Sequence, residues 1–217
     1  VFNQPDRFGG DEKFAEGLVN RLSILSAAPT SQKDTGSAPY VKTSVFGGGD
    51  IKDSIWNFSG MSAPIKILQD NTYGVGVTIS TPPLPDTPNF DGTVRSAPLI
   101  VSANDQIYPS VALETLRAFY DQPNYQTRVT PEVGIEWIRM GRQPPIETTS
   151  TSDVMITYWN DFDRISASDL TEKTLHGHDG ISDKILIWGM TAEGFNNPVS
   201  TPKGVMYPHE VQANLLQ

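Results

Sequence analysis

The feature that most constrains the fold is an almost continuous run of apolar residues near the C-terminus. The run Lys184-Ile185-Leu186-Ile187-Trp188-Gly189 does not alternate between apolar and polar side chains, and it ends in glycine. Such a run is typical of a strand that is buried on both faces, as in parallel sheets covered by helices. A second short strand is predicted at Ser23–Ala28, and we expect the two strands to be neighbours or near neighbours in one sheet.

Two helices are predicted to flank this sheet. Apolar residues recur at helical spacing within 11–22, which is typical of an amphipathic helix. Ser110 is expected to cap a second helix over 110–120. In this helix the charged residues Glu114 and Arg117 are expected to lie on the outer side, away from the apolar face.

The remaining pattern contains shorter strands and a last helix. The strand Tyr73–Ile79 contains two glycines, which let another backbone come close to it. Val94–Val101 and Gln106–Tyr108 predict an antiparallel hairpin. Further strands are predicted at Val133–Met140 and Val154–Tyr158, and a final helix is predicted at His209–Gln217. These patterns predict one α/β domain, with a mainly parallel sheet flanked by helices and an antiparallel hairpin excursion.

The composition limits the classes of partner. Lys and Arg total 16 and Asp and Glu total 25 in the 217 residues, so the net charge is −9. An acidic chain repels phosphate backbones and anionic lipid headgroups, which argues against a nucleic-acid partner. The absence of cysteine excludes disulfides, thiolate metal sites and a cysteine nucleophile. No apolar run approaches the roughly 20 residues of a membrane span.

One stretch near the N-terminus is close to an enzyme signature. Gly9-Gly10-Asp11-Glu12-Lys13-Phe14 resembles the signature of diguanylate cyclases, but Lys13 interrupts it. In those cyclases the motif lies on a hairpin between two strands, whereas here it opens a predicted helix. A glycine turn followed by Asp11 as the N-cap explains the same residues.

A metal site is the alternative to a purely structural reading of one loop. His176, His178 and Asp179 offer ligands that suit zinc or nickel, and the only other histidine is His209. A polar loop before a strand is the usual place for such residues, and we interpret them as a solvated loop. Trp56 and Trp159 lie in polar stretches of the sequence. We expect their side chains to pack in the core, and the alternative is that they line a ligand pocket. No catalytic motif is present, and the sequence predicts no catalytic residue, no metal ligand and no cofactor.

Six stretches, in the same order over nearly the whole chain, resemble a known family. The most specific are Asp91–Leu99, which matches the pattern D-G-x-x-R-x-x-P-L, and Tyr108–Leu113, which matches Y-P-S-[LVF]-A-L. The others lie at 1–11, 155–158, 184–192 and 201–216. Together they resemble the second subtype of CHASE domains, the cyclases/histidine kinases associated sensory extracellular domains. One departure is Gln212, which stands where the family usually has histidine.

The physical chemistry of the signature indicates structural roles for its residues, and it identifies no ligand-binding residue. Asp91-Gly92 predicts a tight turn, and Arg95 is expected to fold back to a carboxylate near that turn. The other signature residues expected to have structural roles are Pro98, Tyr108, Pro109, Ser110, Gly189, Thr191, Thr201 and Pro202.

The resemblance implies a sensor domain of a bacterial transmembrane receptor, exposed on the periplasmic or extracellular side of the inner membrane. It implies flanking transmembrane helices outside this chain, and a cytoplasmic cyclase or kinase as output. The signal would be a small molecule or a protein, and the intact receptor is expected to be a homodimer. The family carries a strand–helix–strand unit before the position of Val1, so residues 1–217 are expected to form one domain that lacks this unit. The alternative function is a periplasmic metal-binding protein or hydrolase that uses the loop with His176, His178 and Asp179.

The final helix is expected to carry the signal, because in the family the chain leads from it into the membrane. Val211 and Leu215 would form its packed side, since they are four residues apart. The run Lys184–Met190 and the turn at Thr201-Pro202 are expected to couple the sheet to this helix.

Overall fold

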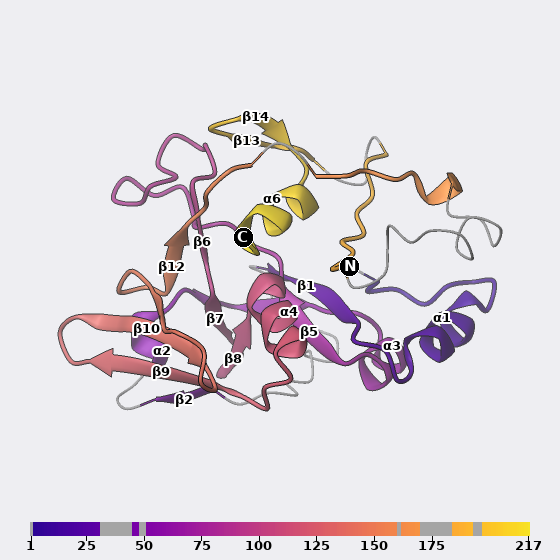
Figure 1. The fold of residues 1–217 in the computed structure, drawn as a ribbon, viewed down its shortest axis with the longest axis horizontal. Coiled ribbons are helices and arrows are strands. Elements are labelled where there is room, and N and C mark those ends of the chain that lie inside the picture. The colour runs from indigo at the N-terminus through magenta and orange to yellow at the C-terminus, as the bar shows by residue number, and fades with distance from the viewer. Residues whose placement is uncertain (1, 31–44, 48–50, 160–161, 170–183, 193–196) are drawn as a thin grey trace.

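The structure is a computed structural model that describes residues 2–30, 45–47, 51–159, 162–169, 184–192 and 197–217 (Figure 1). The helices within these ranges are α1 (Gly10–Leu18), α2 (Ile51–Ser54), α3 (Lys66–Asn71), α4 (Val111–Phe119) and α6 (Pro208–Leu215), with a 3-10 turn at Ala167–Asp169. The fold is a mixed α/β arrangement, as the sequence predicts at the level of class.

The strands form several small sheets. Strands β4 (Gly60–Ser62), β1 (Ile24–Thr30) and β5 (Gly74–Val77) form the first, and β11 (Ile146–Glu147), β10 (Gly134–Met140), β9 (Tyr125–Thr130) and β2 (Val45–Gly47) form the second. The third contains β3 (Asn57–Phe58), β7 (Ile100–Ala103) and β8 (Gln106–Pro109). Two pairs complete the set, β6 (Ser96–Pro98) with β12 (Asp153–Met155) and β13 (Val199–Thr201) with β14 (Gly204–Met206).

The expectation of a mainly parallel sheet is wrong for the described residues. Parallel pairing is limited to β1 with β5, β2 with β9 and β3 with β7, and every other described strand pair is antiparallel. The physical reason is the length of the connections. Several strands follow one another through tight turns, which join antiparallel strands, whereas a parallel pair needs a long crossover.

The apolar run at 184–189 is the largest departure from expectation. It forms no strand, and Trp188 is 67% exposed, with Ile185, Leu186 and Ile187 also exposed. The partners of β1 are β4 and β5, so the predicted pairing of β1 with this run is absent from the described residues. An apolar run records the tendency to be buried, but burial also requires neighbouring elements that cover it.

The start of α1 differs from expectation in its cap. Gly9 is the N-cap in a left-handed conformation with φ 72°, and Asp11 lies inside the helix. The carboxylate of Asp6 accepts the backbone N–H of Gly10 at 2.7 Å, while Asp11 accepts the backbone N–H of Asp6 at 2.7 Å. The helix also ends at Leu18 and not at residue 22 as predicted. Asn20 is left-handed, with φ 58°, so the chain turns away from the helix axis there.

The hairpin is antiparallel, as predicted, and pairs Ile100 with Pro109 through Ala103 with Gln106. The predicted strand over 94–101 is divided into β6 and β7, and only β7 belongs to the hairpin, because β6 pairs with β12. Its two turn residues, Asn104 and Asp105, have φ values of 48° and 61°. Positive φ at both central residues defines the type I′ turn that suits the twist of paired strands.

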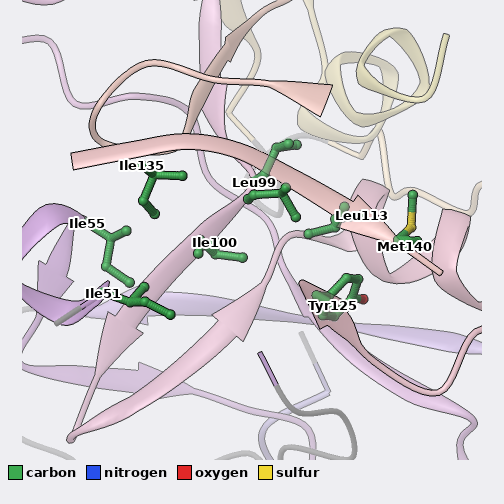
Figure 2. Packing of buried hydrophobic residues seen from close by; sticks show 9 residues of the cluster. Ile51, Ile55, Leu99, Ile100, Leu113, Tyr125, Ile135 and Met140 are labelled. Atoms are coloured by element: carbon green, nitrogen blue, oxygen red, sulfur yellow. The ribbon is translucent and has the colours of Figure 1, made fainter. Parts of the chain in front are cut away.

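The main hydrophobic cluster lies where α2, α4 and the sheet of β9 and β10 meet the strand β7. In Figure 2, Ile51 of α2 and Ile55, which follows this helix, lie on one side of Ile100 together with Ile135 of β10, while Met140 at the end of β10 lies on the opposite side. Leu113 of α4 joins the same cluster, together with Leu99, Tyr125 and Ile138. This cluster fixes α4 against β7 and β9 and thereby places the N-terminal end of α4.

The glycines of β5 let α4 come close, as predicted. A Cβ atom on Gly76 would lie 2.5 Å from Cα of Val111, and one on Gly74 would overlap the carboxylate of Glu114. Real Cβ atoms do not approach a backbone this closely, so glycine at 76 lets the backbone of α4 lie against β5, and glycine at 74 leaves room for the side chain of Glu114.

We expect Gly76→Ala to destabilise the protein, because the added methyl group meets the backbone of α4, which cannot move aside as a side chain can. The loss should be about 1–3 kcal/mol, as for other overpacked sites. The matched control is Gly17→Ala in α1, where nothing lies within 4 Å and where alanine should stabilise the helix by about 0.5–1 kcal/mol. Urea unfolding measures both changes, and equal midpoints for the two variants would contradict the close packing of α4 on β5.

Candidate functional site

The signature turn is closed by an ion pair. The guanidinium of Arg95 donates two parallel hydrogen bonds to the carboxylate of Asp91, at 2.7 and 2.8 Å, so the contact expected from the sequence is present. Gly92 turns the chain with φ 80°, and the backbone N–H of Thr93 also donates to Asp91. The hydrogen bonds from Arg95, and then that from Thr93, hold the pKa of the Asp91 carboxyl well below its usual value. The turn therefore keeps its shape as a charged, bidentate unit.

A buried asparagine that sequence reasoning missed holds this turn to the body of the protein. Asn89 accepts the backbone N–H groups of Arg95 at 2.7 Å and Ser96 at 3.1 Å through its side-chain oxygen. Its amide nitrogen donates to the carbonyls of Thr81 and Ser96. All four hydrogen bonds that the side chain can form are made inside the protein. A single asparagine in a proline-rich stretch carries no sequence signal for such a role.

A second buried carboxylate lies at Asp153, opposite Pro98 in the pairing of β12 with β6. Asp153 is 3% exposed and accepts hydrogen bonds from the indole of Trp56 at 3.1 Å and from Thr81 at 2.6 Å. The hydroxyls of Thr149 and Thr151 also donate to it.

The hydroxyl of Ser96 donates to Thr81 at 2.8 Å, which links Asp153 to the residues around the signature turn. The indole N–H of Trp56 thus belongs to this network, and its ring packs against the hydrophobic cluster that contains Met61 and Val101. Trp159, in contrast, is 59% exposed.

The Tyr108-Pro109-Ser110 stretch connects β8 to α4. Tyr108 is buried, and its hydroxyl donates to the side chain of Gln106 at 3.2 Å. Pro109 is the last residue of β8, and Ser110 caps α4 by accepting the backbone N–H of Leu113 at 3.1 Å. The chain therefore passes from strand to helix at Ser110, as the sequence predicts.

The C-terminal helix packs against residues 94–98, which lie within the signature and include β6, and which we call the signature strand. Val211 is buried in a cluster with Val94, Ala97, Ile156 and Tyr158, and Leu215 packs against the same cluster. The hydroxyl of Tyr158 donates to the carbonyl of Val94 at 2.8 Å. The packed side of α6 is therefore the one predicted, and Gln212 is buried beside it.

The β13–β14 turn ties the signature strand to the region above α6 (Figure 1). Thr201 is buried, and its hydroxyl donates to the carbonyl of Gly204 at 2.6 Å across the turn that contains Pro202. The backbone N–H of Val94 donates to the carbonyl of Ser200 at 2.8 Å. The β13–β14 strand pair and the signature strand are thus held together directly.

The segment 184–192 meets the N-terminal end of α6. A Cβ atom on Gly189 would overlap the imidazole of His209, so glycine lets the ring lie against the backbone. The hydroxyl of Tyr207 donates to the carbonyl of Thr191 at 3.2 Å, and the rings of Tyr207 and His209 are stacked with centroids 5.8 Å apart. These contacts join the segment to the helix, but the segment is not a strand, so the expected coupling of a sheet to α6 through it is absent from the described residues.

The described residues contain no group of three His, Asp or Glu side chains arranged to hold a metal ion. His176, His178 and Asp179, the residues of the alternative metal site, lie outside the described residues. In the part of the chain that the structure covers, no helix combines the length and the apolar character that crossing a bilayer requires.

The family model of the CHASE2 domain matches residues 1–217, and the chain belongs to this family. It is therefore an extracellular sensory domain of signalling receptors. Neither the comparison with curated proteins nor the comparison with solved structures gave a match.

His209 gives a test of the contact between Gly189 and α6. Burial lowers the pKa of His209 below 6.5; nearby Glu210 opposes this shift, and Arg164 adds to it. A group whose pKa is lowered on folding is held neutral in the native state, so its contribution to stability is present above the unfolded pKa and is lost as the pH falls below about 6.5. We expect the imidazole resonances of His209, assigned by comparison with His209→Gln, to titrate below 6.5. In Gly189→Ala, which pushes the ring outward, the pKa should return towards 6.5. A titration of wild-type His209 at or above 6.5 would contradict the buried contact.

Proposed function

We propose that this chain is the sensor domain of a bacterial transmembrane receptor of the inner membrane, exposed to the periplasm or the extracellular side. In this proposal one domain spans 1–217, has no catalysis of its own, and relays its signal to a cytoplasmic cyclase or kinase. The family to which the chain belongs supports the proposal, as does the absence of catalytic motifs in the sequence.

The observation that carries the relay is the position of α6 between two parts of the protein. One side of the helix packs through Val211 on the cluster beside the signature strand, and its N-terminal end meets Gly189 and Thr191. A shift of α6 therefore changes its contacts with both parts. A ligand or protein partner shifts α6 if it binds two arrangements of the domain with different affinity.

In the intact receptor the proposed unit is a homodimer, with transmembrane helices outside this chain. A change in the relation between two α6 helices is then the simplest signal that crosses a membrane without a channel. The stacked ring of His209 and the hydrogen bond from the backbone N–H of Tyr207 to the carboxylate of Glu210, at 2.8 Å, keep the start of the helix defined, which such a mechanical role requires.

Insertion of one and of two alanines after Gln217 in the full-length receptor tests the relay. Each added helical residue rotates the downstream chain by about 100° and advances it by about 1.5 Å, so we expect both insertions to change the cytoplasmic output. The matched control is the same insertion after Pro144, in the exposed turn between β10 and β11, which should leave the output unchanged. Normal output from both insertions after Gln217 would rule out this role for α6.

A further inference from the structure

A depression opens where α1 ends and where β1 and β5 begin. Figure 1 shows that α1 and α3 lie side by side at this side of the molecule. Its volume is about 430 Å³, which is within the usual range for sites that bind small molecules. We propose that it binds a small organic carboxylate with a short apolar tail, and that Tyr73 couples its occupation to the buried ion pair of α4. The proposal rests on the proposed sensory function, for which it supplies a ligand class.

The polar part of the depression is cationic. Arg21 lines it, and within the described residues its guanidinium forms no ion pair. The amides of Asn20 and Asn71 line the same depression. A guanidinium offers two parallel N–H donors that match a carboxylate, which makes an organic acid the fitting partner.

The backbone that carries Arg21 is held on both sides. The N–H of Arg21 donates to the carbonyl of Leu18 at 3.2 Å, and the N–H of Ser23 donates to the carbonyl of Arg21 at 2.8 Å. Asn20 adopts the left-handed conformation that turns the chain between α1 and β1. The backbone position of Arg21 beside the depression is therefore fixed by the fold before a ligand arrives, while its exposed side chain stays free to reach a ligand.

The apolar part consists of Leu18, the last residue of α1, and Leu22, which lies in the connection between α1 and β1. Leu18 is buried in the small core between α1 and α3, while Leu22 is 67% exposed at the depression. An exposed leucine beside the guanidinium of Arg21 suits a molecule that has an alkyl group and a carboxylate. Burial of an alkyl chain against Leu22 contributes about 25 cal/mol per Å² of apolar surface, which inorganic anions cannot supply.

Tyr73 connects the depression to the interior. It lines the depression, and its ring faces the guanidinium of Arg117 with 4.9 Å between the charge centre and the ring centroid. Arg117 is 4% exposed and pairs with Glu114 of the same helix. The backbone N–H groups of Tyr73 and Gly74 both donate to the carbonyl of Ser23, so the start of β5 and the wall of the depression move together.

This arrangement gives a route from ligand to output helix. A molecule that contacts Tyr73 changes the surroundings of Arg117, and the pair of Arg117 with Glu114 belongs to α4. Helix α4 in turn contacts α6. The coupling needs a ligand that favours one position of the Tyr73 ring over another, since equal affinity for both positions would shift nothing.

Binding is measured on the purified 217-residue chain by isothermal titration calorimetry, with butanoate, hexanoate and benzoate as probes. Hexan-1-ol and hexylamine serve as neutral and cationic controls. We expect at least one carboxylate to bind while the alcohol and the amine do not, and Arg21→Gln to weaken that binding at least about tenfold, as loss of a bidentate charged contact does. Arg142→Gln, an arginine in the β10–β11 turn, should leave the affinity unchanged. Absence of binding by all three carboxylates, equal binding of hexanoate and hexan-1-ol, or unchanged affinity in a folded Arg21→Gln variant would each overturn the proposal.

The coupling has its own readout. Hydrogen exchange in the presence of the binding carboxylate should slow at the amides of α4, and Tyr73→Leu should remove this protection while binding through Arg21 persists. Protection confined to 18–22 and 71–73 would overturn the coupling. If no carboxylate binds but insertions after Gln217 alter the receptor output, the ligand class is wrong and the proposed relay stands.

Discussion

The arrangement of the described core depends on one buried ion pair in α4. Arg117 donates to both carboxylate oxygens of Glu114, at 2.9 and 2.7 Å, and to the carbonyl of Gln122 at 2.6 Å. Tyr125 of β9 donates its hydroxyl to the same carboxylate. Burial opposes the charge of Arg117, but the hydrogen bonds and charge of Glu114 outweigh it and raise the pKa of the guanidinium. Burial, together with the charge of Glu114, also raises the pKa of Tyr125, so the phenol stays a donor.

The pair explains why the elements around α4 fit only in one way. A buried pair costs desolvation energy that its own attraction barely offsets, so its main effect is on the precision of packing, while loss of one partner costs about 3–5 kcal/mol. Glu114 reaches its partners only because Gly74 leaves room for the carboxylate. The ion pair therefore fixes the distance of α4 from β5 and its orientation towards β9.

The buried carboxylate of Asp153 also specifies how its neighbours pack, but its hydrogen-bond donors are neutral groups. Its hydrogen bonds join the indole of Trp56 to hydroxyls from two other segments, at Thr81 and at Thr149 and Thr151. A buried carboxylate without sufficient donors is costly, so these segments stay in register around it. The signature turn is attached to this network, and the cluster under Val211 lies beside the same strand, so α6 rests on a part of the protein that is rigidly specified.

Local chemistry is readable in the sequence, and long-range chemistry is not. The cap at Ser110, the turn closed by Asp91 and Arg95, and the packed side of α6 each depend on residues within a few positions of one another, and the structure contains all of them. The expectation that Glu114 and Arg117 lie outside is wrong, although charged residues three apart in a helix usually face water. Their burial requires Tyr125, Tyr73 and Gly74, which lie on other elements, and no local pattern reports such partners.

The run at 184–189 is a second case in which the local sequence pattern does not predict burial, and it lies next to α6. Its composition matches a buried strand, yet in the described protein its side chains are exposed and Gly189 contacts His209. Helix α6 thus has one neighbour that is held by buried polar networks and another whose apolar side chains face water. A rearrangement that covers exposed apolar surface lowers the free energy of the protein in water. A rearrangement of the networks around Asp153 and Glu114 breaks hydrogen bonds and raises it. Within the proposed relay, we therefore expect α6 to move more easily relative to the 184–191 segment than relative to the signature strand.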